Sequence, residues 1–216
     1  MRVSLVRGLT RVLVVGIALV TLVGVGMQPA NAATTVFTDG FETGNLAGYR
    51  QVTHCGVQQS VVHSGSWAWR ATNNNGQPSY AYRTLPANYQ NIQVTAWVYI
   101  VSHASTVKLF AVRPAYDRSL DVYVDQRNRV SVRNNIGGVT TYSTTTMAIG
   151  GWHQLALHAI IGTGSVYVSL DGAAVPGLTL THQNLGSLPF NQLRLGDLAT
   201  AATFDIAIDD VVVMSS

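Results

Sequence analysis

The sequence beyond its first 32 residues predicts an all-β protein, a two-sheet antiparallel β-sandwich of the jelly-roll type. Apolar and polar residues alternate along about a dozen short segments, as they do in strands with one buried face. Turn-forming residues separate these segments at intervals of roughly 8–12 residues. After residue 32 no stretch carries apolar residues at helical spacing, which argues against a helical fold.

The first 32 residues predict a secretory signal peptide. Three arginines within residues 2–11 precede an apolar run over residues 12–27, and the small residues 30–32 form a cleavage site. A membrane anchor is the alternative, but the run is shorter than the span of about 20 residues that a bilayer requires. We therefore expect cleavage after residue 32, a secreted, extracellular protein, and one domain over residues 33–216.

Charge and cysteine content restrict the partners of the exported chain. Three of the 13 Lys and Arg residues lie in the leader, so residues 33–216 carry ten basic and ten acidic side chains and no net charge. This balance gives no electrostatic case for nucleic acid, or for a membrane once the leader is removed. Cys55 is the only cysteine, so no internal disulfide can form and packing must stabilise the fold. We expect a monomer in which Cys55 is a small buried residue.

The expected strands follow from the alternation. The clearest lies at residues 92–101, where Val94, Ala96 and Val98 share one face and Trp97 lies on the other. The remaining strands are predicted at residues 66–72, 79–85, 107–112, 120–125, 129–134, 140–146, 152–161, 165–170, 178–180, 192–195 and 204–214. The pair Asp171-Gly172 and residues 126–128 predict tight hairpin connections.

Acidic residues gather at the two ends of the exported chain. Residues 36–50 are predicted to form the first strand and the loop after it, and they carry Asp39 and Glu42, the sole glutamate of the protein. The last predicted strand carries Asp205, Asp209 and Asp210. If the first and last strands pair, these carboxylates converge. The sequence then predicts a loop that can hold a cation.

Three passages resemble the concanavalin A-like superfamily, and within it the laminin-G-like jelly-roll domains of secreted bacterial proteins. The opening FTDGFETGNLAGYR is similar to a D-x-F-E-x-G-x-L-x-x-W start, with Tyr49 at the place of the tryptophan. The passage GGWHQLALHAIIGTGSVYVSLDGAAV resembles the laminin-G-like middle, and the ending FDIAIDDVVVM resembles a last strand shared with several families of carbohydrate-binding modules. The resemblance implies a two-sheet sandwich, often with a structural calcium ion where the first and last strands meet.

Carried over to this sequence, the resemblance implies that Asp39, Glu42 and Asp210 are the calcium ligands. Carboxylate oxygens are the ligands that calcium prefers. Asp209 is an alternative to Asp210, because neighbouring residues of a strand point to opposite faces and both do not easily reach one ion. These acids could instead lie in solvent or accept hydrogen bonds from backbone amides in turns.

Aromatic residues opposite apolar strand faces predict a carbohydrate site. Aromatic rings stack on the apolar faces of sugars while polar neighbours bind the hydroxyl groups. We expect ligand contacts from Trp97, Tyr99, Asp121, Tyr123 and Arg133. Trp97 could instead fill the second side of a fully buried strand. The function predicted is a secreted, non-catalytic module that binds a polysaccharide or a cell-surface glycan.

The sequence does not carry the carboxylate pair of a glycoside hydrolase. Glu42 is its only glutamate, and Asp121 and Asp125, on one strand face, are about 13 Å apart, which suits neither retention nor inversion.

A polysaccharide lyase acting on a uronate-containing glycan is the alternative function. Such an enzyme needs a tyrosine or histidine base and a cation that neutralises the uronate carboxylate. The residues that could supply these groups are Lys108, Arg113, Tyr116, Tyr123 and Arg133. No histidine occupies an obvious position among these strands, and a solvated sheet face explains the same pattern. A structural coat or adhesion protein without a small ligand is a third possibility.

Overall fold

The computed structural model describes residues 33–73, 76–114 and 118–216, and it contains only strands in these ranges. The strands are β1 (Thr34–Asp39), β2 (Arg50–Thr53), β3 (Cys55–Gln58), β4 (Ala68–Asn73), β5 (Ser79–Tyr89), β6 (Asn91–His103), β7 (Val107–Arg113), β8 (Leu120–Val124), β9 (Arg129–Asn134), β10 (Val139–Thr146), β11 (Trp152–Ile160), β12 (Ser165–Leu170), β13 (Ala173–Leu180), β14 (Phe190–Asp197) and β15 (Phe204–Ser215). Within the described ranges no helix is long and apolar enough to cross a membrane. The predicted signal peptide lies outside the described residues.

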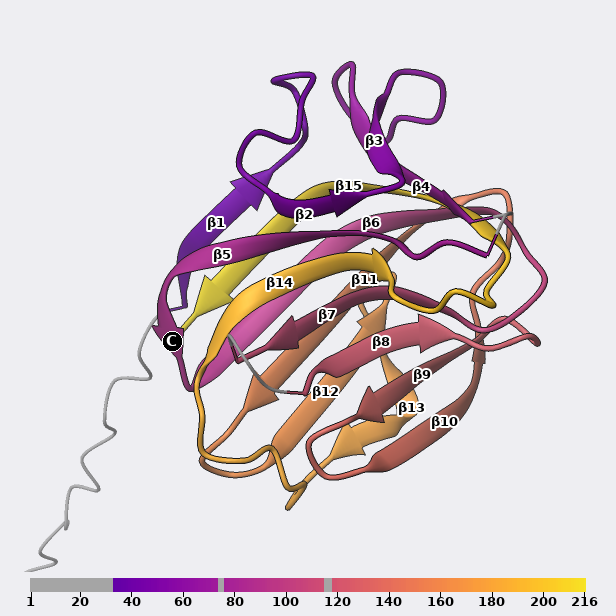
Figure 1. Cartoon of the computed structure of the whole chain (residues 1–216). Coiled ribbons are helices and arrows are strands. Elements are labelled where there is room, and N and C mark those ends of the chain that lie inside the picture. The colour runs from indigo at the N-terminus through magenta and orange to yellow at the C-terminus, as the bar shows by residue number, and fades with distance from the viewer. Residues whose placement is uncertain (1–32, 74–75, 115–117) are drawn as a thin grey trace, which may run out of the picture. The chain divides into compact units, whose positions relative to one another are not determined.

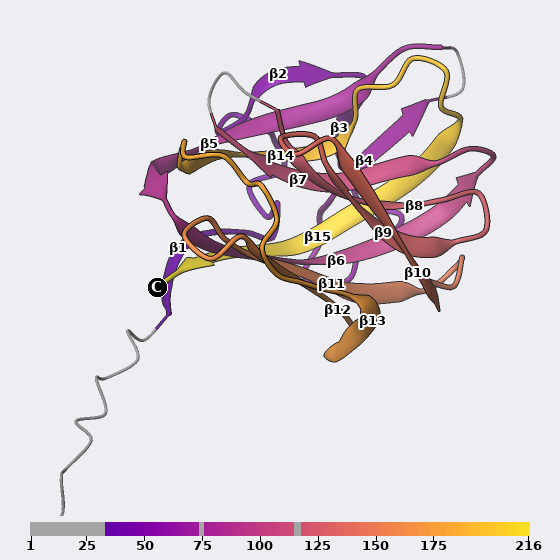
Figure 2. The same cartoon turned by 90° about the horizontal axis from the view of Figure 1, so that it is seen from below.

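The strands form two antiparallel sheets that pack face to face, as Figures 1 and 2 show. Sheet A has the strand order β13-β12-β11-β6-β15-β4-β3, and β1 also pairs with β15. Sheet B has the order β10-β9-β8-β7-β14-β5-β2. The predicted class, a two-sheet antiparallel β-sandwich, is confirmed.

Alternation along the strands builds the core between the sheets. In β6 every second residue from Ile92 to Ile100 is at most 1% exposed, while Trp97 and Tyr99 lie on the opposite face. In β8 Leu120, Val122 and Val124 belong to the same core. Burial of this apolar surface is the main stabilising contribution to the fold, and it leaves each sheet with one outward face.

The first and last strands are neighbours, as the sequence predicts. β1 pairs with β15 in antiparallel register, and Asp39 lies opposite Val211. The long strand β15 changes partner on this edge, because residues 204–208 pair with β4 and residues 211–215 with β1. A register shift against β6 follows Asp209, and Asp210 there has a φ of 46°. This irregularity turns both carboxylates toward one loop.

Two short strands differ from the sequence predictions. Residues 51–60, where no strand was predicted, contain most of β2 and all of β3, two four-residue strands at the sheet edges. Both strands lack buried residues, so no apolar alternation marks them. Trp152, the first residue of β11, lies half-buried outside the core cluster. The tight turn at Asp171-Gly172 is confirmed, since both residues have the positive φ of a two-residue hairpin loop.

Candidate functional site

The predicted ligand-binding residues lie on two different outward faces. Trp97 and Tyr99 project from β6 on the outer face of sheet A. Asp121 and Tyr123 in β8 and Arg133 in β9 project from the outer face of sheet B. The core separates the two faces, so the five residues do not form a single site.

On sheet A the aromatic rings are engaged with one another. The His63 ring stacks on Trp97 with 3.9 Å between the ring centroids, and it meets Trp152 edge-on at 5.4 Å. Tyr99 meets Trp152 edge-on at 5.5 Å. Because one face of Trp97 is covered by His63, this cluster offers a sugar less ring surface than the sequence suggests.

His63 and Ser64 are held by both acidic residues of the β15 irregularity. Oδ2 of Asp209 accepts hydrogen bonds from the backbone N–H groups of His63 and Ser64, at 3.0 and 3.2 Å. Asp210 lies 2.7 Å from Nδ1 of His63 and accepts the Ser64 hydroxyl at 2.8 Å. Neighbouring residues of a regular strand point to opposite faces, but the side chains of Asp209 and Asp210 both reach this loop. The left-handed backbone of Asp210 interrupts the alternation at this irregularity.

Glu42 also binds the loop that contains His63 and Ser64. Its carboxylate accepts the backbone N–H groups of residues 66 and 67, all at 3.0 Å. A Cβ at Gly65 would come within 2.5 Å of this carboxylate, and Gly65 has a φ of 66°, so glycine suits the position on both counts.

The carboxylates expected to hold calcium are therefore arranged as hydrogen-bond acceptors. Asp39 likewise accepts the backbone N–H of Phe41 at 2.8 Å. Among the described residues no group of three or more His, Cys, Asp or Glu side chains is placed to hold a metal ion. In this arrangement the carboxylates of Asp39, Glu42 and Asp210 accept hydrogen bonds, and calcium binding stays a prediction from the resemblance.

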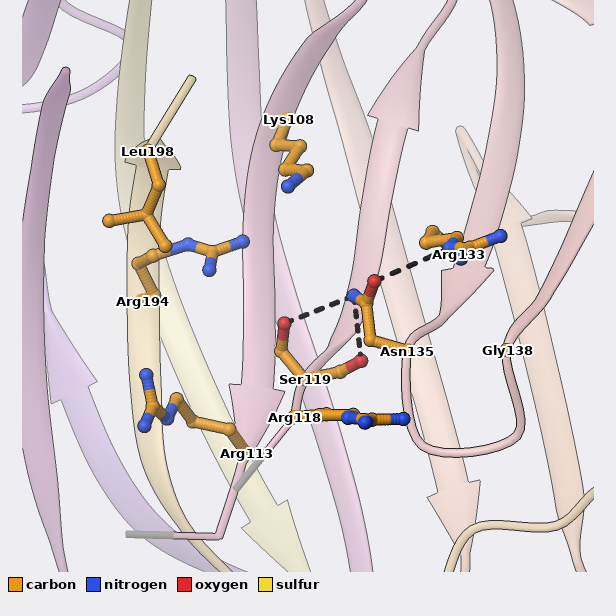
Figure 3. Close-up of a pocket in the computed structure, with 9 residues that line it drawn as sticks. All are labelled: Lys108, Arg113, Arg118, Ser119, Arg133, Asn135, Gly138, Arg194 and Leu198. Atoms are coloured by element: carbon orange, nitrogen blue, oxygen red, sulfur yellow. Dashed lines mark hydrogen bonds between the residues drawn. The ribbon is translucent and has the colours of Figure 1, made fainter. Parts of the chain in front are cut away.

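A hollow with a distinctive chemistry lies on the outer face of sheet B (Figure 3). It has a volume of about 440 Å³, and we call it the basic hollow. Its lining residues are Lys108, Arg113, Arg118, Ser119, Arg133, Asn135, Gly138, Arg194 and Leu198. Five of the ten Lys and Arg residues of residues 33–216 thus line one hollow. The zero net charge of residues 33–216 conceals this local concentration of positive charge.

Strand register explains how residues far apart in sequence meet here. One row of paired residues crosses β5, β14, β7, β8, β9 and β10 and consists of Tyr82, Arg194, Ala111, Asp121, Arg133 and Thr140. Ala111 lies between Arg194 and Asp121, and its small side chain lets the guanidinium reach across β7. Nη2 of Arg194 lies 2.9 Å from Oδ1 of Asp121.

Asp121 is the buried counter-ion beneath the basic hollow. Its side chain is 0% exposed and that of Arg194 is 1% exposed. The other carboxylate oxygen of Asp121, Oδ2, lies 3.4 Å from Nζ of Lys108 and accepts a hydrogen bond from Nδ2 of Asn135 at 2.9 Å. Burial alone raises the pKa of Asp121, but the Arg194 and Lys108 charges outweigh burial and hold this pKa below its usual value. Asp121 therefore stays ionised and orients two cations rather than contacting a ligand itself.

Tyr123 lies beside the basic hollow, but it is only 5% exposed. Burial, followed by the interaction with Tyr142, raises the pKa of the Tyr123 phenol. Tyr142 on β10 meets the Tyr123 ring edge-on at 6.5 Å and is itself 57% exposed. Of this pair, Tyr142 offers the accessible ring.

Sequence reasoning found Arg133 as a ligand residue and named Lys108 and Arg113 only for the lyase alternative. It missed Arg118, Arg194 and Tyr142. A signal for Arg194 is present, because a single arginine between Leu193 and Leu195 in a buried strand requires a carboxylate partner. Asp121 lies in the same kind of setting, and pairing the two needs the strand order that only the structure supplies.

Comparison with solved structures finds this fold in several proteins. A conserved carbohydrate esterase from the Shiga toxin-encoding bacteriophage phi24B aligns with a TM-score of 0.63 and 16% identity, over 85% of this chain and 99% of that one. A sialidase aligns with a TM-score of 0.58 and 12% identity over 83% of this chain, and the binding domain of botulinum neurotoxin serotype G with 0.56 and 11% over 83%. The match spans 18% of the sialidase chain and 47% of the neurotoxin chain.

No family model matches the sequence, and no curated protein does either. The structural alignments establish a shared β-sandwich fold, and at identities this low they establish the fold alone. They do not single out the concanavalin A-like superfamily.

Proposed function

We propose that the exported protein is a secreted carbohydrate-binding module that binds glycans on the outer face of sheet B. The observation that carries this proposal is the basic hollow itself, a depression of about 440 Å³ in which all lining residues except Gly138 and Leu198 have hydrogen-bonding side chains. Sugars present many hydroxyl groups, and a rigid sheet lined by oriented donors and acceptors suits them. The carbohydrate-related proteins that share the fold support the same class of ligand.

The outer face of sheet B supports this role better than that of sheet A. On sheet A, Trp97 is covered by His63 and Tyr99 is engaged with Trp152. On sheet B, Arg133 and Lys108 are partly exposed, and Tyr142 is 57% exposed although the Arg129 guanidinium lies over its ring at 5.4 Å from the centroid. Stacking on Tyr142 and hydrogen bonds from Arg133 would together orient a sugar.

The basic hollow would also suit the uronate lyase that the sequence leaves open. Lys108, Arg113 and Arg133 line it together, whereas Tyr116 lies outside the described residues. Tyr123, the described tyrosine proposed as base, is nearly inaccessible and its pKa is raised, so its phenolate is scarce at neutral pH. None of the described lining residues is a histidine. These features favour binding without cleavage.

A glycan array with the secreted protein tests the proposal. We expect signal on a subset of glycans that is lost in Arg133→Ala and kept in Arg127→Ala. Arg127 is an exposed cation in the turn between β8 and β9, at the other end of these strands from Arg133, so its removal changes net charge equally. Absence of binding to every glycan would contradict the proposal and favour a structural coat or adhesion role. An absorbance rise from unsaturated products would indicate the lyase.

A further inference from the structure

We infer that the ligand of the basic hollow is an acidic glycan, one that carries carboxylate or sulfate groups on neighbouring sugar units. This inference rests on the proposed function and narrows it to a class of ligand. It follows from three features of the hollow, namely its excess of positive charge, the orientation of its cations and the burial of its carboxylates.

The hollow holds more cations than its carboxylates neutralise. Lys108 and Arg194 share the single carboxylate of Asp121. Asp197 lies close by, but its carboxylate accepts the backbone N–H groups of Lys108 and Ala199, at 2.9 Å each. Lys108, Arg194 and Arg133 thus stand beside two described carboxylates. The surplus attracts a polyanion and disfavours a neutral ligand that would have to displace hydration from these charges.

Both carboxylates are hidden from a ligand. Asp121 is 0% and Asp197 1% exposed, so an incoming anion meets the cations and not the acids. Arg194 is held by Asp121 and by the carbonyl of Gly196, at 3.3 Å from Nε, and its charge is therefore fixed beneath the hollow. A positive charge that is already positioned adds attraction without the entropy loss of ordering a flexible side chain.

Arg133 is positioned to contact the ligand directly. Among the described residues its hydrogen-bond partners are neutral, with Nη1 donating to Oγ1 of Thr140 at 2.7 Å and Nε to Oδ1 of Asn135 at 3.3 Å. These two bonds use two of the five N–H donors of a guanidinium and fix its plane. The remaining donors form the planar fork that binds carboxylate or sulfate oxygens in pairs.

The cations surround the hollow instead of clustering at one point (Figure 3). Arg194 and Arg133 stand in the same cross-strand row with β7 and β8 between their strands, so their Cα atoms are about 14 Å apart at the usual strand spacing. Lys108 lies on β7, one of these two intervening strands. This spread suits two anionic groups on consecutive sugars better than a single small anion.

Nucleic acid is the competing polyanion, and the structure favours a glycan over it. Nucleic-acid binding draws on many phosphate contacts along an extended basic surface. Here half of the cations of residues 33–216 lie in one hollow, and the net charge over those residues is zero. A short acidic segment of a glycan fits such a confined site.

Titration calorimetry with three hexasaccharides of equal length, a uronate, a sulfated and a neutral one, tests the inference on the secreted protein. We expect at least one acidic hexasaccharide to bind about tenfold or more tightly than the neutral one, since a charged hydrogen bond contributes at this level. Its affinity should fall by about tenfold or more when the salt rises from about 0.05 to 0.5 M. Lowering the pH to about 3 should weaken carboxylate binding and spare sulfate binding, which identifies the anionic group.

Variants then locate the site. We expect Lys108→Met and Arg133→Ala each to weaken acidic binding about tenfold or more, Arg133→Lys to weaken it less, and Arg127→Ala to change it less than about twofold. Circular dichroism and melting curves would check that each variant is folded. Equal binding of neutral and acidic hexasaccharides would overturn the inference and leave the proposed function intact. Binding to none would defeat both, and tighter binding of a DNA oligonucleotide of equal charge would also overturn the inference.

Discussion

Replacing Asp121 by asparagine removes a buried carboxylate that bridges Arg194 and Lys108. Arg194 is 1% exposed, so the substitution leaves a buried guanidinium without a counter-ion. At 2.9 Å and an effective dielectric constant near 20, the attraction between Arg194 and Asp121 is about 6 kcal/mol. Most of this attraction offsets the desolvation of the two charges in the native protein. When one partner is lost, the desolvation cost of the other remains.

We therefore expect Asp121→Asn to lower the free energy of unfolding by about 3–5 kcal/mol. For a domain of this size the melting temperature would fall by roughly 6–20 °C. Lys108 adds less to the effect, because its side chain is 30% exposed and screened by solvent. Urea unfolding followed by tryptophan fluorescence gives the free energies directly.

A double-mutant cycle separates the ion pair from other effects of the substitution. We expect Asp121→Leu combined with Arg194→Met to cost less than either single change, because no charge is then left buried. Asp171→Asn serves as the control, since the Asp171 side chain is 48% exposed and its pair with His153 should contribute less than about 1 kcal/mol. If both single changes cost under about 1 kcal/mol and their effects add, the buried ion pair is not what holds Arg194 in place.

Four further predictions concern the rest of the chain. Because the pKa of Asp121 is held below its usual value of 3.8, its contribution to stability is present above pH 3.8 and is lost as the pH falls through its lower native pKa. The difference in free energy of unfolding between wild type and Asp121→Asn, measured in urea, should therefore shrink over that range. A constant difference would contradict this. Trp97→Ala removes the stacking of His63 on Trp97 and should lower the free energy of unfolding by about 2 kcal/mol without weakening acidic glycan binding. A loss of binding at unchanged stability would place the site on sheet A. The predicted calcium site should raise the melting temperature in calcium relative to chelator, whereas identical melting curves would mean that Glu42 and Asp210 serve only as hydrogen-bond acceptors. Mass spectrometry of the exported protein should find residue 33 at its N-terminus, and an uncleaved chain would refute the signal peptide.

Much of the scaffold follows from periodicity in the sequence. The alternation in residues 92–101 predicts β6, because it reflects which face of the strand is buried, and the resemblance implies that the first and last strands meet. β2 and β3 escape prediction because short edge strands bury no residues and therefore carry no alternation. The joint approach of Asp209 and Asp210 to one loop depends on a left-handed residue within β15, which strand rules do not anticipate.

The site is less predictable than the scaffold, because it depends on strand order. Arg194 and Asp121 are 73 residues apart in sequence and meet only because β14 and β8 both pair with β7. Trp97 and Tyr123 show similar patterns in sequence, yet they face away from each other on opposite sheets. An exposed ring also cannot be told from a covered one by composition, so the sequence predictions named Trp97 and did not name Tyr142.

The location of a bound acidic oligosaccharide tests the central claim most directly. In a crystal structure of the secreted protein with such a ligand, we predict that the anionic groups of the sugar lie against Arg133 and Lys108 on the outer face of sheet B. A ligand bound instead beside Trp97 and Tyr99 on sheet A, with the basic hollow unoccupied, would contradict the account.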